Sequence, residues 1–147
     1  MTTSKQQTSG RSEPFAATTL RRPWRALLVD DDKLMLAVLT DLLHDLGTHD
    51  IKTAASGDEA AVAFDRMLPP PDVILCDLKM PGGDGFQFME VLASRKFAGS
   101  VVLVSGMEAR VMNSASLMAR FHRLNVVATL SKPVSGPALG AALAKLA

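Results

Sequence analysis

The chain has 147 residues, of which 48% are hydrophobic and 21% charged, and its formal net charge is +1. This length suits one domain of ordinary size, and the apolar content excludes a chain that is disordered throughout. The near-neutral charge gives no global attraction to nucleic acid or to an anionic membrane, and the single cysteine, Cys76, excludes an internal disulfide and a thiolate metal cage.

The chain divides into a polar leader and one folded region. Residues 1–24 are rich in Thr, Ser, Gln and Arg without an apolar period, so we expect a flexible tail there. Over residues 25–147 short apolar runs alternate with longer segments of helical periodicity, which predicts a single domain of repeated strand–helix units. No apolar run reaches the roughly 18 residues that a membrane span requires. With the lone cysteine, this favours a cytoplasmic protein.

Five short runs are predicted to form parallel strands, and the apolar first and third runs have the character of strands that are buried on both faces. They span residues 26–29, 51–55, 73–76, 101–104 and 126–130. Apolar residues at helical spacing predict helices between and after these strands. The helices span about residues 35–46, 56–68, 84–92, 107–124 and 135–146. Strict alternation of this kind predicts an α/β fold, a doubly wound five-stranded parallel sheet in the flavodoxin-like order 2-1-3-4-5.

Short signals mark the ends of the predicted helices. Ser56 and Glu59 have the Ser-x-x-Glu spacing of a capping box, and Asp84 is placed as an N-cap with Gln87 three residues on. Gly47 stands where a helix stop is expected. These signals support the predicted boundaries.

Polar residues follow four of the five predicted strands. Three aspartates at 30–32 follow the first strand, Asp77 the third, Ser105 the fourth and Lys132 the fifth. In a doubly wound sheet the carboxyl ends of the strands meet at the ligand-binding edge, so we expect these groups to converge. Carboxylates that converge repel one another unless a cation joins them. Oxygen-only ligands favour Mg²⁺, whereas the three histidines lack the spacing of a zinc site.

This set of groups suits phosphoryl transfer to an aspartate. Asp77 is the expected nucleophile, and Lys132 together with the metal ion would offset the charge on the phosphoryl oxygens. Ser105 would donate a hydrogen bond to the product. Each residue alone is common at strand ends, and only their coincidence at one edge carries the hypothesis.

Four stretches of the sequence match a known family in order and spacing. They are Leu-Leu-Val-Asp-Asp-Asp, Asp-Val-Ile-Leu-Cys-Asp-Leu-Lys-Met-Pro-Gly-Gly-Asp-Gly, Val-Leu-Val-Ser and Ser-Lys-Pro. Together they resemble a response-regulator receiver domain of the two-component systems, over about residues 25–147. The segment 106–126 resembles that of receivers fused to EAL-type phosphodiesterase domains.

The resemblance implies a role for each matched residue. Asp77 corresponds to the phosphoacceptor, and Asp30 and Asp31 to the acidic pair of the family. With Asp77 and the backbone carbonyl of Lys79, this pair would hold Mg²⁺. A histidine kinase or phosphotransfer protein would supply the phosphoryl group, and a downstream protein or an output domain would read the signal. The family catalyses only its own phosphorylation and dephosphorylation, which implies a signalling protein and not an enzyme.

The resemblance also implies how the signal is read. Ser105 and Lys132 would contact the phosphoryl group and shift a pre-existing equilibrium of the face formed by the fourth helix, fifth strand and fifth helix. Thr129 occupies the switch position, which is usually aromatic in the family, so a rotating ring is not expected here. Lys79 and Met107 occupy positions that resemble those tuning the lifetime of the phosphorylated form.

Two other functions fit part of the sequence. A pseudo-receiver would use the same fold as an interaction module without phosphorylation. A haloacid-dehalogenase-like phosphatase would use Asp30, Asp32, Ser105 and Lys132, but it also needs an acidic pair after the lysine, and no Asp or Glu follows Lys132. DNA binding is not expected, because no helix-turn-helix segment or basic run follows the receiver-like region.

Overall fold

The structure is a computed structural model that describes residues 24–78, 84–106 and 121–146. Its centre is a five-stranded parallel sheet in the order β2-β1-β3-β4-β5, which confirms the predicted fold class and strand order. The strands are β1 (Arg25–Val29), β2 (Asp50–Ala54), β3 (Val73–Asp77), β4 (Ser100–Ser105) and β5 (Asn125–Ser131). The helices are α2 (Lys33–Asp45), α3 (Gly57–Arg66), α4 (Asp84–Ser94) and α6 (Gly136–Leu143), the last followed by the short 3₁₀ helix η3 (Ala144–Leu146).

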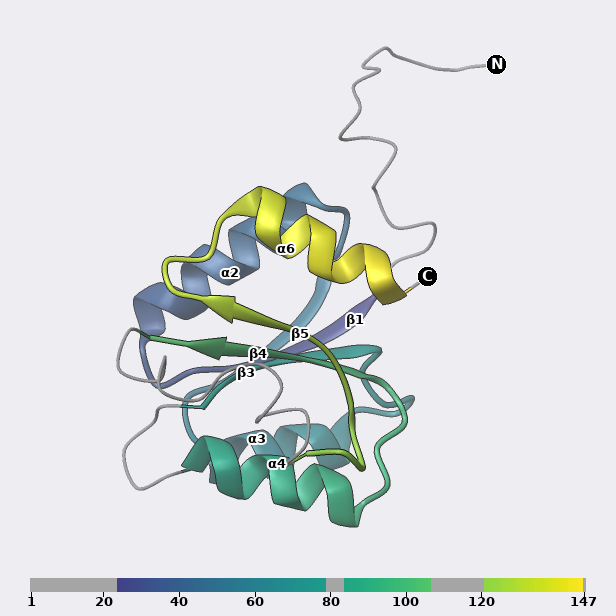
Figure 1. Ribbon diagram of the computed structural model, residues 1–147. Coiled ribbons are helices and arrows are strands. Elements are labelled where there is room, and N and C mark those ends of the chain that lie inside the picture. Colours follow the sequence, from purple (N-terminus) through teal and green to yellow (C-terminus); the bar gives the residue numbers. More distant parts are fainter. Residues whose placement is uncertain (1–23, 79–83, 107–120, 147) are drawn as a thin grey trace.

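The helices cover both faces of the sheet. Helices α2 and α6 lie on one face, and α3 and α4 lie on the other (Figure 1). The fourth predicted helix, 107–124, falls largely outside the described residues. Its last four residues, 121–124, form a turn, so the expectation that this helix continues to residue 124 is wrong.

The core consists of two apolar layers separated by the sheet. One layer joins the strands to α2 and α6, and the other joins them to α3 and α4. Strand β3 lies at the centre and is buried along its whole length, because it has a neighbour on each side and helices above and below. This explains why its sequence is continuously apolar until Asp77.

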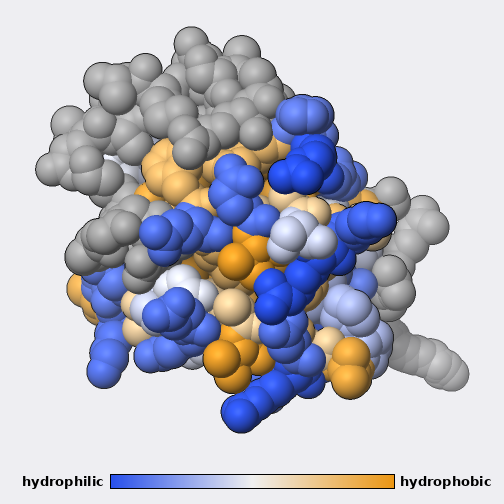
Figure 2. Space-filling model, turned by 90° about the horizontal axis from the view of Figure 1, so that it is seen from below, coloured by the Kyte–Doolittle hydropathy of each residue, from blue (hydrophilic) through white to orange (hydrophobic). Residues whose placement is uncertain are grey.

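The outer surface over α3 and α4 mixes hydrophilic and hydrophobic side chains (Figure 2). An ion pair joins α3 to the residue that follows α4, with Arg95 Nε 2.8 Å from Asp65 Oδ1. Across the parts of the chain that the structure describes, no helix is both long and apolar enough to cross a membrane.

Most of the predicted helix ends are confirmed, with small differences in detail. Asp32 caps α2, and Gly47, just beyond that helix, has a φ of 96°, a conformation that favours glycine. Ser56 caps α3 and accepts a hydrogen bond from Glu59 N at 3.1 Å. The Glu59 side chain, however, accepts from Ala55 N rather than from the N-cap N–H of a regular capping box. Helix α4 begins at Asp84 itself, one residue earlier than an N-cap at that position would give.

Strand β5 contains one residue more than the neighbouring stretch of β4. Val101 pairs with Val126, but Val102 pairs with Ala128, so Val127 is a bulge in the ladder. Beyond the bulge the pairing is regular up to Ser105 and Ser131. The bulge thus sets which residues of β5 reach the carboxyl edge of the sheet.

Candidate functional site

The carboxyl ends of the strands bring the predicted site residues together. Val29 pairs with Cys76, so Asp30 and Asp77, the next residue of each segment, emerge side by side from β1 and β3. Asp77 in turn pairs with Val104, which places Ser105 one residue further along β4. Lys132 follows β5, and its backbone N–H donates to the Ser105 carbonyl at 2.8 Å. Parallel strands with this register therefore deliver all four residues to one edge.

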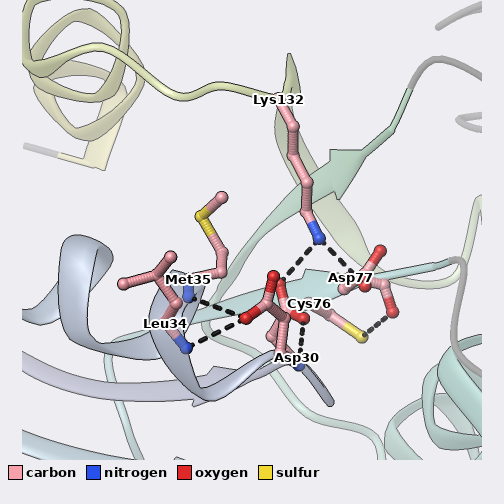
Figure 3. A network of polar contacts seen from close by, with 7 residues as sticks. Asp30, Leu34, Met35, Cys76, Asp77 and Lys132 are labelled. Carbon is pink, nitrogen blue, oxygen red and sulfur yellow. Dashed lines mark hydrogen bonds and ion pairs between the residues drawn. The ribbon is translucent and has the colours of Figure 1, made fainter.

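The Lys132 ammonium joins two buried carboxylates. Its Nζ lies 2.9 Å from Asp30 Oδ2 and 3.2 Å from Asp77 Oδ2 (Figure 3). The side chains of Asp30 and Asp77 are only 1% and 2% exposed. Two carboxylates this deeply buried require a cation, and the lysine supplies one positive charge between them.

A third carboxylate completes an acidic cluster. Asp30, Asp31 and Asp77 each offer one oxygen, and the three oxygens lie within 4.8 Å of one another. Asp31 is exposed to solvent, unlike its two partners, so the cluster opens at the surface. Three carboxylate oxygens without nitrogen or sulfur donors are a ligand set suited to a hard divalent cation such as Mg²⁺. One lysine offsets only one of the three negative charges, so the residues present fit such an ion.

The backbone orients the first of these carboxylates. Asp30 Oδ1 accepts a hydrogen bond from Asp32 N at 2.9 Å, which leaves Oδ2 facing Lys132. The Asp32 side chain points elsewhere: its Oδ1 accepts from Leu34 N and Met35 N at the start of α2. The third aspartate of the run is thus a helix cap, and the first two belong to the site.

The comparisons with known proteins agree with this geometry. A family model described as the response regulator receiver domain matches residues 26–144. The chain belongs to the response regulator receiver family. This finding confirms the resemblance to receivers, whereas the likeness to EAL-fused receivers stays a prediction.

Among similar curated proteins are two transcription regulators. The receiver is 30% identical to the transcriptional regulatory protein PdtaR of Mycobacterium tuberculosis over 113 residues, which are 77% of this chain and 51% of that protein. It is 32% identical to the DNA-binding transcriptional activator EvgA of Escherichia coli over 81 residues, 54% of this chain and 38% of that protein. The chain spans about half the length of PdtaR and less of EvgA.

Solved receiver structures share the fold. A response regulator from Colwellia psychrerythraea superposes with a TM-score of 0.69 at 29% identity, covering 85% of this chain and 97% of that one. A chain of the CheX–CheY–BeF₃–Mg²⁺ complex of Borrelia burgdorferi gives a TM-score of 0.72 at 22% identity, with 84% and 89% covered.

The electrostatics of the receiver site keep Lys132 charged. Burial lowers the pKa of this amine, but the hydrogen bond to Asp30 and the charge of Asp77 outweigh burial, so the pKa is raised above its ordinary value. Burial is also the main cause of a raised pKa at the Cys76 thiol, and the negative charges of Asp77 and Asp30 add to it. The thiol is therefore protonated and unreactive in the folded receiver.

Of the remaining predicted residues, two lie on strands and two fall outside the described residues. Ser105 is half-buried at the end of β4, in register with Ser131. Thr129 lies on β5 opposite Leu103 and is half-buried. Lys79, whose carbonyl is predicted to bind the metal ion, and Met107 fall outside the described residues.

Sequence reasoning overlooked Gly85, which lies against the backbone of Asp77 and Leu78. A signal was present, because glycine is unfavourable inside helices and Gly85 is the second residue of α4.

Proposed function

We propose that this chain is the phosphoacceptor receiver of a two-component phosphorelay, with Asp77 as the residue that takes the phosphoryl group. The observation that carries the proposal is the Asp77 carboxylate, which is buried at the end of β3, 3.2 Å from Lys132 Nζ and in one cluster with Asp30 and Asp31. An ion pair that only stabilises the fold would need one carboxylate beside Lys132, whereas the carboxyl edge of the sheet holds three, which favours a functional site.

The chemistry follows from the position of each group. A carboxylate oxygen of Asp77 forms a bond to phosphorus in line with the breaking bond, and the leaving group of the donor departs with that electron pair. Lys132 offsets negative charge on the transferred oxygens, and the Ser105 hydroxyl donates a hydrogen bond to one of them. Asp30, Asp31, Asp77 and the Lys79 carbonyl would hold Mg²⁺, which when bound supplies further positive charge to the phosphoryl oxygens.

In this proposal the Lys132 ammonium changes its partner when Asp77 is phosphorylated. Before phosphorylation its ammonium compensates the buried carboxylates of Asp30 and Asp77. After phosphorylation the same ammonium pairs with the phosphoryl group, so its contact with Asp77 is exchanged for a new one. This exchange couples the site to β5, the strand that carries Lys132 at its end.

The proposal also assigns partners and location. A histidine kinase or a phosphotransfer protein is the donor, and a change of the surface around β5 and α6 alters the binding of a downstream protein or output domain. We place this event in the cytoplasm, where a chain with one buried thiol stays reduced. The receiver would act on its own aspartate and on no separate substrate.

Intact-mass spectrometry tests the proposal. The protein is incubated with Mg²⁺ and acetyl phosphate, and the wild-type chain is expected to gain the mass of one phosphoryl group, which hydroxylamine then removes as it does from an acyl phosphate. Asp77→Asn should not gain this mass, whereas the matched control Asp41→Asn, an exposed aspartate within α2, should behave as the wild type.

Unchanged mass in the wild type would reject the phosphoacceptor function. If that protein still bound Mg²⁺, the pseudo-receiver would be the better description. Gain of a phosphoryl group by Asp77→Asn would place the acceptor elsewhere.

A further inference from the structure

Gly85 lies so close to the end of β3 that no side chain fits there. A Cβ atom at this position would lie 2.7 Å from Leu78 Cα and 2.9 Å from Leu78 O, and closer still to the carbonyl oxygen of Asp77. All three atoms belong to the backbone, so none can turn aside as the end of a side chain could. The 2.7 Å contact would have to lengthen by about 0.7 Å to reach the 3.4 Å of an ordinary van der Waals contact.

The peptide between Asp77 and Leu78 is held from two sides. On the β4 side, Leu78 N donates to Val104 O at 3.2 Å. On the α4 side, Gly85 lies directly against the peptide. The Cys76 sulfur contacts both segments, 3.6 Å from Asp77 O and 4.0 Å from Gly85 O. The first turn of α4 and strand β4 thus clamp the peptide that carries the proposed phosphoacceptor.

We propose that Gly85 is a positioning residue for Asp77. Because residue 85 has no side chain, α4 begins directly against the Asp77–Leu78 peptide, and this contact fixes the direction in which the Asp77 carboxylate faces Lys132. The inference rests on the proposed phosphoacceptor function and deepens it. Gly85 touches no reacting atom and acts only through the backbone of Asp77.

The size of the expected effect follows from the displacement. Phosphoryl transfer depends on in-line geometry, and a misplacement of about 1 Å can cost about a hundredfold in rate. A methyl group at residue 85 forces a shift of the same order on the backbone of the nucleophile. The same shift would spread the oxygens of Asp30, Asp31 and Asp77, which now lie within 4.8 Å of one another, and so weaken binding of a divalent cation.

Gly85→Ala tests the inference, with Gly99→Ala as the matched control. A Cβ at Gly99 would also collide, lying 2.9 Å from Asp72 O and nearer to the Phe97 ring, but it sits at the opposite end of β4. Both variants should unfold at a lower temperature than the wild type. Only Gly85→Ala should lose about a hundredfold in the initial rate of phosphorylation by acetyl phosphate, measured where both variants are folded.

Binding of Mn²⁺, followed by electron paramagnetic resonance without a phosphodonor, gives a second readout. Gly85→Ala should bind Mn²⁺ more weakly than Gly99→Ala does. A folded Gly85→Ala protein with the rate and the Mn²⁺ affinity of Gly99→Ala would overturn the inference.

A milder variant serves if Gly85→Ala does not fold. Cys76→Ala removes the sulfur packed against the clamped peptide, and its control Val101→Ala truncates a buried residue of the same apolar layer at the far end of β4. If Cys76→Ala loses more phosphorylation rate and more Mn²⁺ affinity than Val101→Ala does, packing around the Asp77–Leu78 peptide positions Asp77. Equal rates and equal affinities in the two variants would reject this positioning. If the wild type binds Mn²⁺ without being phosphorylated, the proposed function fails while the Mn²⁺ comparison still decides the positioning role.

Discussion

Neutralising Asp31 should stabilise the protein when divalent cations are removed. Asp31 is an exposed carboxylate whose oxygen lies within 4.8 Å of oxygens of Asp30 and Asp77. The Lys132 ammonium supplies one positive charge to this cluster through its contacts with the two buried members. Asp31→Asn keeps the size of the side chain and removes one negative charge, so it relieves repulsion without opening a cavity.

The expected gain follows from the charges in the cluster. The Asp31 carboxylate is repelled by the carboxylates of Asp30 and Asp77, and the Lys132 ammonium offsets about one of these two negative charges. Asp31 is therefore left with the net repulsion of one unit charge at a separation below 5 Å. A pair of unit charges at this distance interacts with about 1 kcal/mol in water and several-fold more in a less polar setting. Because Asp31 is exposed, we expect the lower energy, about 1 kcal/mol. For a domain of this size, this energy corresponds to a rise in Tm of about 3 °C.

Thermal unfolding in EDTA and in Mg²⁺ measures both sides of this prediction. In EDTA, Asp31→Asn should unfold at a higher temperature than the wild type, whereas the control Asp41→Asn on α2 should change little. Added Mg²⁺ binds the native state and should raise the Tm of the wild type more than that of Asp31→Asn, which lacks one ligand. A lower Tm of Asp31→Asn in EDTA, or equal stabilisation of both proteins by Mg²⁺, would refute the electrostatic reasoning.

Three further predictions concern the surroundings of the cluster. Lys132→Met leaves Asp30 and Asp77 buried without their cation, which should lower the free energy of unfolding by about 3 kcal/mol. Since the pKa of Lys132 is raised above its ordinary value of 10.5, the stability that its ammonium contributes is fully present below pH 10.5 and is lost only as the pH rises through the raised pKa. In urea titrations, the difference in the free energy of unfolding between Lys132→Met and the wild type should therefore shrink only in strong alkali. Asp32→Ala should lose about 1 kcal/mol in chemical denaturation through the missing cap of α2, whereas Asp32→Asn, which can still cap, should lose little; equal losses would contradict a capping role. Because burial raises the pKa of the Cys76 thiol, thiol reagents should label the unfolded chain rapidly and the native receiver slowly, and rapid labelling of native protein would show that the thiol is accessible.

The sheet and the main site residues could be predicted from the sequence for a physical reason. Parallel strands covered on both faces have continuous apolar sequences, as β1, β3 and β4 do, and each of these three apolar runs is followed by a polar residue. Asp77 ends such a run, and the topology of a doubly wound sheet requires Asp30 and Lys132 to meet it at one edge. The pairing register in the structure supplies the distances that the sequence could only imply.

Other features depend on contacts that the sequence pattern does not encode. Glu59 has the spacing of a capping box, yet its carboxylate binds Ala55 N, one residue before the expected donor. The turn at 121–124 ends a helical pattern that by periodicity alone continues. The role of Gly85 depends on the approach of α4 to β3, a distance between elements that no local pattern reports.

The bulge divides β5 into two stretches that respond differently to a deletion. Loss of Val127, the extra residue, would leave Val126 opposite Val101 and Ala128 opposite Val102, so the later residues would keep their partners and their faces. Loss of a residue beyond the bulge, such as Leu130, would instead move each later residue back by one position and turn it to the opposite face. Pro133 would then stand where Lys132 now meets the two buried aspartates, and the acidic cluster would lose its ammonium without any substitution of the lysine.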